Sequence, residues 1–233
     1  MSPSKRVTLT TLALLLLGGC SADQLSVVVQ SARAPGDKCD FKDDTIYVES
    51  GSVDMTSYNL GPGTTDQQLS SYGQIFGWQN NMQPIPLIVN GQTVDTGSGN
   101  DFIVDEAVMS YQYSDGSVTF PNEVQNLHAV INAGGTHEKN SVGLNLIGAG
   151  ASAALLGHLP VVGNPQTLVT SFLFRGKTAA GRGLDTNVVR FPLTIYRSSA
   201  ATVVCDPAAG VVPATGPCGI PGRDLTVHCV TST

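Results

Sequence analysis

The sequence predicts an all-β protein: an antiparallel β-sandwich with one short helix and a C-terminal tail stapled by disulfides. Three observations lead to this fold class. Apolar and polar residues alternate over many short segments, which is the period of a half-buried strand. Turn-forming pairs such as Asn90-Gly91 separate these segments at intervals of about 8–12 residues. Three of the five cysteines lie in the last thirty residues, so we expect the tail to be cross-linked.

The chain begins with an export leader. Lys5 and Arg6 precede the apolar run Val7–Leu17, which is shorter than the roughly 20 residues that a helix needs to cross a hydrocarbon core. A basic start followed by a short apolar run is typical of a signal peptide. We therefore assign residues 1–19 to a signal peptide that is absent from the mature protein.

The apolar run ends in the tetrapeptide LGGC, whose cysteine is Cys20. This tetrapeptide resembles the lipobox of bacterial lipoproteins, and the resemblance implies that Cys20 is acylated and becomes the first residue of the mature chain. Ser21 in the next position resembles the default signal for the outer membrane. The resemblance thus implies an envelope protein anchored in the outer membrane through its N-terminal lipid, facing the periplasm or the outside.

The rest of the chain divides into three expected parts. Residues 20–44 form the lipid anchor with an acidic tether or first edge segment, 45–204 the β-sandwich, and 205–233 a Cys/Pro/Gly-rich tail. A helix is expected at 149–159, ended by a glycine and a proline. In chain order, strands are expected around Ile46–Met55 (interrupted by Gly51-Ser52), Tyr72–Gln79, Leu87–Val94, Phe102–Tyr113, Gln125–Ile131, Ser141–Ile147, Leu168–Lys177 and Asn187–Arg197.

The order of these parts also supports a resemblance. An acidic loop region, then strands, then a cysteine-closed tail is similar to small immunoglobulin-like envelope lipoproteins of Gram-negative bacteria. The resemblance implies an immunoglobulin-like sandwich and implies no particular activity.

Four cysteines remain after lipidation: Cys39, Cys205, Cys218 and Cys229. Export to an oxidising compartment favours two disulfides. We favour Cys218–Cys229 with Cys39–Cys205, and Cys205–Cys218 with Cys39–Cys229 is the close alternative. Either way the tail is expected to be stapled to itself and to carry little of the core.

One sequence segment suggests a nucleotide-binding site. Val142–Gly157 contains G-x-G-x-x-A between an apolar strand and a helix, the arrangement of a dinucleotide-binding turn. That chemistry needs an acidic residue about 20 residues later, yet none occurs between Glu138 and Asp185. We therefore expect a strand-turn-helix packing element and no cofactor.

A second string suggests a protease. Asp95 begins a D-T-G-S sequence that resembles the catalytic turn of aspartic proteases, in which two carboxylates share one proton. With a single copy the chain would have to dimerise, and the apolar strand that normally feeds the aspartate is replaced by polar Asn90–Thr93. An exported, dimeric aspartic protease using Asp95 is therefore an alternative function.

The same region could hold a metal ion. Asp95, Asp101, Asp105 and Glu106 carry oxygen ligands of the kind that Ca²⁺ prefers. Glycines occupy two of the ligand positions of an EF-hand, so at most an irregular loop site is expected, and these four residues are weak candidates.

The charge of the sequence indicates which classes of binding partner to expect. The sequence pI is near 5.0, which argues against nucleic acid. Acidic residues outnumber basic ones before Lys139, and the balance reverses after it. If the two sheets or the two ends of the sandwich divide in this way, the molecule is an electrical dipole with a docking face for a basic or acidic partner.

These observations lead to one expected function and two alternatives. We expect a non-catalytic lipoprotein, a structural or protein-interaction module of the cell envelope, with no catalytic residues. The alternatives are the aspartic protease and a calcium- or glycan-binding envelope module.

Overall fold

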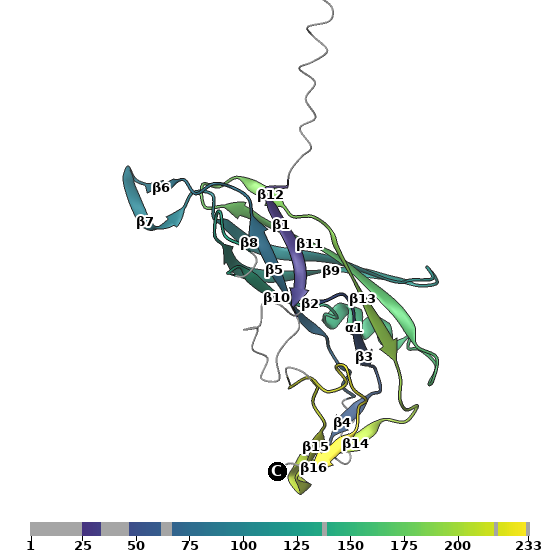
Figure 1. Cartoon of the computed structure of the whole chain (residues 1–233). Coiled ribbons are helices and arrows are strands. Elements are labelled where there is room, and N and C mark those ends of the chain that lie inside the picture. Colours follow the sequence, from purple (N-terminus) through teal and green to yellow (C-terminus); the bar gives the residue numbers. More distant parts are fainter. Residues whose placement is uncertain (1–24, 34–46, 62–66, 137–138, 217–218, 232–233) are drawn as a thin grey trace, which may run out of the picture.

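The computed structural model describes residues 25–33, 47–61, 67–136, 139–216 and 219–231 (Figure 1). Cys20, Cys39 and Cys218 lie outside the described residues. Within these ranges the protein is mostly β-structure, with one short α-helix, α1 (Ala149–Leu156). The expected all-β class, antiparallel sheets and single short helix are therefore confirmed.

One of the two main sheets has four strands. Along the sheet their order is β10 (Ser141–Asn145), β5 (Gly73–Asn80), β1 (Val27–Arg33) and β2 (Tyr47–Val48). All neighbours are antiparallel. The segment at 20–44, expected to contain the tether or a first edge segment, thus contributes β1, which lies between β5 and β2.

The other main sheet has six strands. Along the sheet their order is β3 (Gly51–Asp54), β13 (Val189–Tyr196), β11 (Gln166–Thr178), β8 (Phe102–Tyr113) and β9 (Thr119–Ile131), with β12 (Gly183–Asp185) also paired to β11. The pairs are antiparallel except for β3, which runs parallel to β13.

The two sheets are joined by an aromatic core. Phe76 of β5 lies 4.8 Å from Phe172, and Trp78 lies 4.4 Å from Phe174, both on β11 (ring centroids). These side chains are almost completely buried. Because side chains alternate between the two faces of a strand, Phe172 and Phe174 fall on the same inner face, as the sequence pattern predicts.

The segment expected as one strand at Leu87–Val94 is a hairpin. Strands β6 (Pro86–Val89) and β7 (Gln92–Ser98) pair with each other and with no other strand of the described chain. Asn90 and Gly91 both have positive φ, 52° and 79°. A two-residue hairpin turn with this twist favours Asn-Gly, so the turn predicted from this pair is confirmed.

The tail contributes to two small two-stranded sheets, one of which it shares with β4. Strand β14 (Val203–Cys205) runs parallel to β4 (Tyr58–Leu60), and β15 (Val211–Pro213) pairs with β16 (Cys229–Thr231) after the 3₁₀ turn η1 (Pro207–Ala209). These strands lie at the end of the molecule opposite the β6–β7 hairpin (Figure 1).

The expected disulfide pairing is wrong. The structure joins Cys205 to Cys229, with the two Cα atoms 5.6 Å apart. Neither pairing weighed from the sequence contains this bond. The cause is the chain reversal between η1 and β16, which returns Cys229 to the end of β14. The tail is stapled to itself, as predicted, but by a different bond.

Candidate functional site

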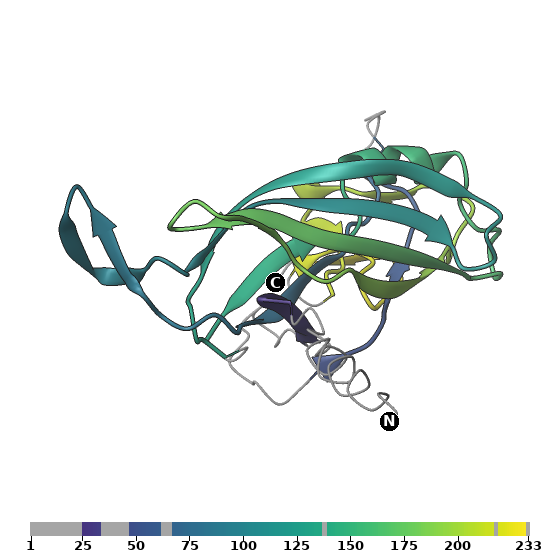
Figure 2. The same cartoon turned by 90° about the horizontal axis from the view of Figure 1, so that it is seen from above.

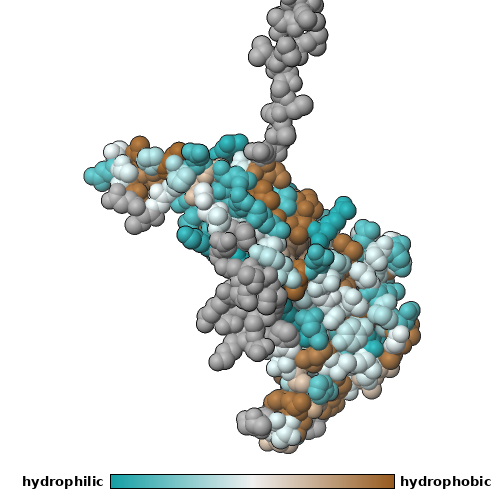
Figure 3. Space-filling view, in the orientation of Figure 1, coloured by the Kyte–Doolittle hydropathy of each residue, from teal (hydrophilic) through white to brown (hydrophobic). Residues whose placement is uncertain are grey.

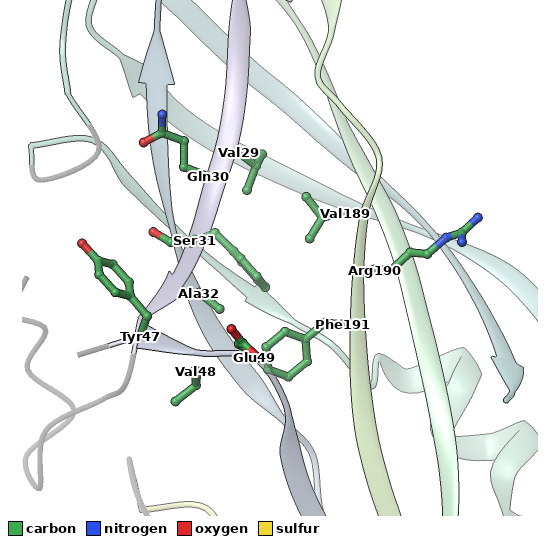
Figure 4. A pocket seen from close by; sticks show the side chains of 11 residues that line it. Val29, Gln30, Ser31, Ala32, Tyr47, Val48, Glu49, Val189, Arg190 and Phe191 are labelled. Carbon is green, nitrogen blue, oxygen red and sulfur yellow. The ribbon is translucent and has the colours of Figure 1, made fainter. Parts of the chain in front are cut away.

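A cleft of about 350 Å³ opens between β1 of one sheet and β13 of the other (Figure 4). Its apolar walls come from both sheets. Val29 of β1 points toward β13, and Val189 and Phe191 point back toward β1. The remaining residues that line it are Gln30, Ser31, Ala32, Tyr47, Val48, Glu49, Phe76 and Arg190.

The cleft exists because β1 is only partly paired on this side. Strand β2 meets β1 only at Ala32 and Arg33. A register shift between Val29 and Ser31 also bends β1 at this point, as expected of a β-bulge. The first half of β1 therefore lacks a neighbouring strand on the side of the cleft.

Asn187 takes the place of a strand neighbour there. Its side-chain oxygen accepts the backbone N–H of Val29 at 2.8 Å, and its amide nitrogen donates to the Val29 carbonyl at 3.1 Å. This pair of bonds is the pattern that an adjacent antiparallel residue makes. It ties the two sheets together beside the cleft without covering it.

The charge of the cleft comes from one side chain. Glu49 and Arg190 are the charged residues that line it. The Arg190 side chain points away from the cleft, because it alternates with Val189 and Phe191 along β13 (Figure 4). The cleft thus combines apolar walls with a carboxylate, which suits an apolar group that carries a positive charge.

The weak metal candidates do not converge. Asp101 is almost buried, and its two oxygens accept the backbone N–H groups of Ser98 at 2.7 Å and Ala133 at 2.8 Å. Asp101 therefore holds backbone together at the base of the β6–β7 hairpin. Asp95 lies in β7. Among the described residues, no group of three or more His, Cys, Asp or Glu could hold a metal ion.

The other two candidates lie on β8. Asp105 is exposed, and Glu106 forms an ion pair with Arg175 at 3.6 Å. Arg175 also lies 3.5 Å from Asp185 of the neighbouring β12. Exposed ion pairs of this kind contribute little to stability. In this structure, however, the Glu106 carboxylate is paired with Arg175.

The nucleotide-like string forms β10 and α1, the strand-turn-helix element that was expected. The start of the helix is occupied by the protein's own carboxylate: Glu123 accepts the N–H of Ala151 at 3.4 Å and the hydroxyl of Tyr111 at 3.1 Å. A Cβ at Gly148 would come within 2.1 Å of this carboxylate. The glycine is therefore explained by the close approach of Glu123.

The charge division expected from the sequence does not follow the sheets. Strands β8 and β9 come from the acidic part of the chain and lie in the same sheet as β11 and β13 from the basic part. The Arg175–Glu106 pair joins the two parts directly. The two sheets thus do not form the two poles of a dipole.

Sequence reasoning missed the cleft. Val189 and Phe191 show the alternation of a strand with one buried face. No local signal reveals that β2 is too short to close the sandwich beside them.

No family model, curated protein or solved structure matches the chain. None of the helices in the described part of the chain is both long and apolar enough to cross a bilayer.

Proposed function

We propose that this protein is a non-catalytic lipoprotein of the outer membrane, a protein-interaction module whose contact surface is the cleft between β1 and β13. The leader and the LGGC tetrapeptide ending at Cys20 support the lipid anchor. The immunoglobulin-like assignment belongs to the same proposal and is supported by two mainly antiparallel sheets around one aromatic core.

The composition of the cleft carries the proposal. Its volume of about 350 Å³ is at the lower end of the range of small-ligand sites. Apolar walls favour an aliphatic group, and Glu49 favours a cation. A lysine or arginine of a partner protein supplies both, because its aliphatic stem packs on apolar surface while its charged group stays at the mouth.

Site-specific photo-crosslinking in the native envelope tests this. Tyr47, which lines the cleft and is 46% exposed, is replaced by p-benzoylphenylalanine. The matched control carries the same group at Tyr196, a half-exposed tyrosine of β13 outside the cleft. We expect a discrete protein adduct from position 47, absent from position 196.

A second change tests the proposed chemistry. Glu49→Lys reverses the charge that lines the cleft, and we expect it to abolish the adduct at position 47, whereas Asp105→Lys on the other sheet should not. The proposal fails if position 47 yields no adduct, or if the adduct is insensitive to Glu49→Lys.

A further inference from the structure

The β6–β7 hairpin projects from the body of the protein as an arm, which we define as residues 82–100 (Figures 1 and 2). The end of β6, next to the polar turn Asn90-Gly91, is apolar: Ile88 is 64% exposed and Val89 50% exposed. Asp95 is the only charged residue in the arm. Figure 3 shows apolar side chains on this projection, interspersed with polar ones. Exposed apolar surface is costly in water and is typical of a contact site.

The arm is held firmly at its base. The N–H of Ile85 donates to the hydroxyl of Ser98 at 2.9 Å, and the N–H of Gly99 donates to the carbonyl of Ile85 at 3.0 Å. Asp101 accepts the N–H of Ser98 as well. These bonds join the two strands at the base of the arm. Asp101 also accepts the N–H of Ala133, which ties this base to the body of the protein.

The start of the folded chain lies beside the arm. Val27, the first residue of β1, pairs with Asn80, the last residue of β5. The next residue, Asn81, donates its N–H to the carbonyl of Ser26 at 2.8 Å and its side-chain amide to that of Leu25 at 3.2 Å. Cys20 precedes Leu25 by five residues, which span at most about 17 Å when extended. A lipid on Cys20 would thus be attached within about this distance of Leu25, whose carbonyl accepts the Asn81 amide at the base of the arm.

Basic side chains flank the same end. The turn between β11 and β12 donates the N–H of Ala180 to the carbonyl of Gly99 at 2.9 Å, so it contacts the base of the arm. Lys177 and Arg182 of this turn region are exposed. Cations at this position attract the anionic headgroups of a membrane surface.

We propose that this end of the molecule faces the membrane and that Ile88 and Val89 insert among the acyl chains of the leaflet that holds the lipid anchor. The occupant of the apolar tip is thus the bilayer itself. The arm and the lipid act as two membrane contacts, which together orient the sandwich and direct the disulfide-bonded tail away from the surface. This inference rests on the proposed lipid anchor at Cys20.

Tryptophan quenching in vesicles tests the inference with the full-length, lipidated protein. The native Trp78 is completely buried and gives a constant background. Val89→Trp places a reporter at the tip, and Ile88→Trp is a second tip variant. Val204→Trp is the matched control, because Val204 is 52% exposed and lies in β14 at the opposite end (Figure 1).

The vesicles contain phosphatidylethanolamine and phosphatidylglycerol, with and without brominated phosphatidylcholine. We expect the emission added at either tip position to shift to shorter wavelength and to be mostly lost with brominated lipid. The emission added at position 204 should be unaffected by brominated lipid and quenched by iodide.

Failure of the anchor and failure of the inference are distinguishable. Flotation of the same vesicles reports whether the lipidated protein is membrane-bound, and its failure overturns the proposed anchor. If the protein floats but the tip reporters respond to iodide as position 204 does, the arm does not insert. Protection of the tip in native envelopes without quenching by brominated lipid would assign the tip to a protein partner instead, and would also overturn the inference.

Discussion

Asp54, at the end of β3, is a completely buried carboxylate that joins three distant segments. Its oxygens accept hydrogen bonds from the N–H (2.9 Å) and hydroxyl (2.6 Å) of Thr56, from the N–H (3.1 Å) and hydroxyl of Ser198, and from the N–H of Val227 (2.8 Å). Burial by itself raises the pKa of this carboxyl, but the hydrogen bonds to its charged form outweigh burial and hold the pKa below its ordinary value of 3.8. Asp54 therefore stabilises the fold as a carboxylate.

Replacing this carboxylate should destabilise the protein. We expect Asp54→Asn to lower the free energy of unfolding at pH 7 by about 2–4 kcal/mol, because hydrogen bonds to a buried charge are lost and an amide hydrogen is placed among donors. Because the pKa of Asp54 is lower in the folded than in the unfolded protein, its charge stabilises the fold at pH values above the unfolded pKa. This stabilisation is lost as the pH falls through the pKa of the folded protein. The difference in the free energy of unfolding between the Asp54→Asn variant and the native protein should thus become smaller below about pH 4.

Denaturant unfolding at pH 7 and pH 3 measures both effects. Asp105→Asn, a change at an exposed carboxylate, is the control and should alter stability little. An equal, pH-independent effect of the two substitutions would contradict the role assigned to Asp54.

Arg223 secures the tail in a similar way. Its side chain is 1% exposed, with the guanidinium 4.6 Å from the centre of the Tyr72 ring and a bond of 3.3 Å to the side-chain oxygen of Gln74. Burial, with the nearby Asp224 carboxylate, raises the pKa of Tyr72 to about 12, so the ring stays neutral at physiological pH. The buried Arg223 thus helps to dock the tail on the sandwich, together with the buried apolar Val227.

Among the elements, the tail depends most on its cross-link. Its strands β14, β15 and β16 have three residues each, too few to be stable alone. The bond between Cys205 and Cys229 closes a segment with a sequence separation of 24. A cross-link that closes a loop of this length lowers the entropy of the unfolded chain and so stabilises the folded protein by about 3–4 kcal/mol.

The Cys205–Cys229 bond also predicts which cysteines form a second disulfide. If all four cysteines are oxidised, the remaining pair is Cys39 with Cys218. We expect non-reducing peptide mapping of the mature protein to recover one fragment linking Cys205 to Cys229 and one linking Cys39 to Cys218. Reduced protein provides the control, and a fragment linking Cys218 to Cys229 would show that the described pairing is not the one in solution.

The whole molecule has two different ends. The arm and the start of the folded chain lie at one end, and the cross-linked tail lies at the other (Figure 1). The cleft between β1 and β13 opens on the side between them. If Cys20 carries a lipid as proposed, the tail lies at the end of the molecule away from the anchor.

Anchoring itself can be tested on the intact chain. We expect Cys20→Ala to leave an uncleaved precursor or, when export uses a leader without a lipobox, to release the protein into the soluble envelope fraction. The tip of the arm exposes only two large apolar side chains, and a single weak membrane contact binds reversibly. Fractionation after a carbonate wash measures the change, with Ser26→Ala as the control. Unaltered membrane retention of the alanine variant would argue against lipidation.

Local patterns were enough for much of the secondary structure. The strand expected at Phe102–Tyr113 has the same bounds as β8, and Asn90-Gly91 marks the hairpin turn. Both signals depend on backbone preferences and on the two-residue period of a strand, which act between near neighbours in the chain. The export leader proposed for residues 1–19 also depends on a local pattern.

The disulfide, the buried polar contacts and the cleft depend on contacts between segments far apart in the sequence. Cys205 meets Cys229, Asp54 meets Val227, and the cleft forms beside Phe191 because β2 pairs with only two residues of β1. Each of these contacts depends on how strands far apart in the sequence align, and several alignments bury the same alternating apolar residues equally well. The choice among them depends on packing of the assembled core and on hydrogen bonds of buried polar groups, which exist only once both sheets have met.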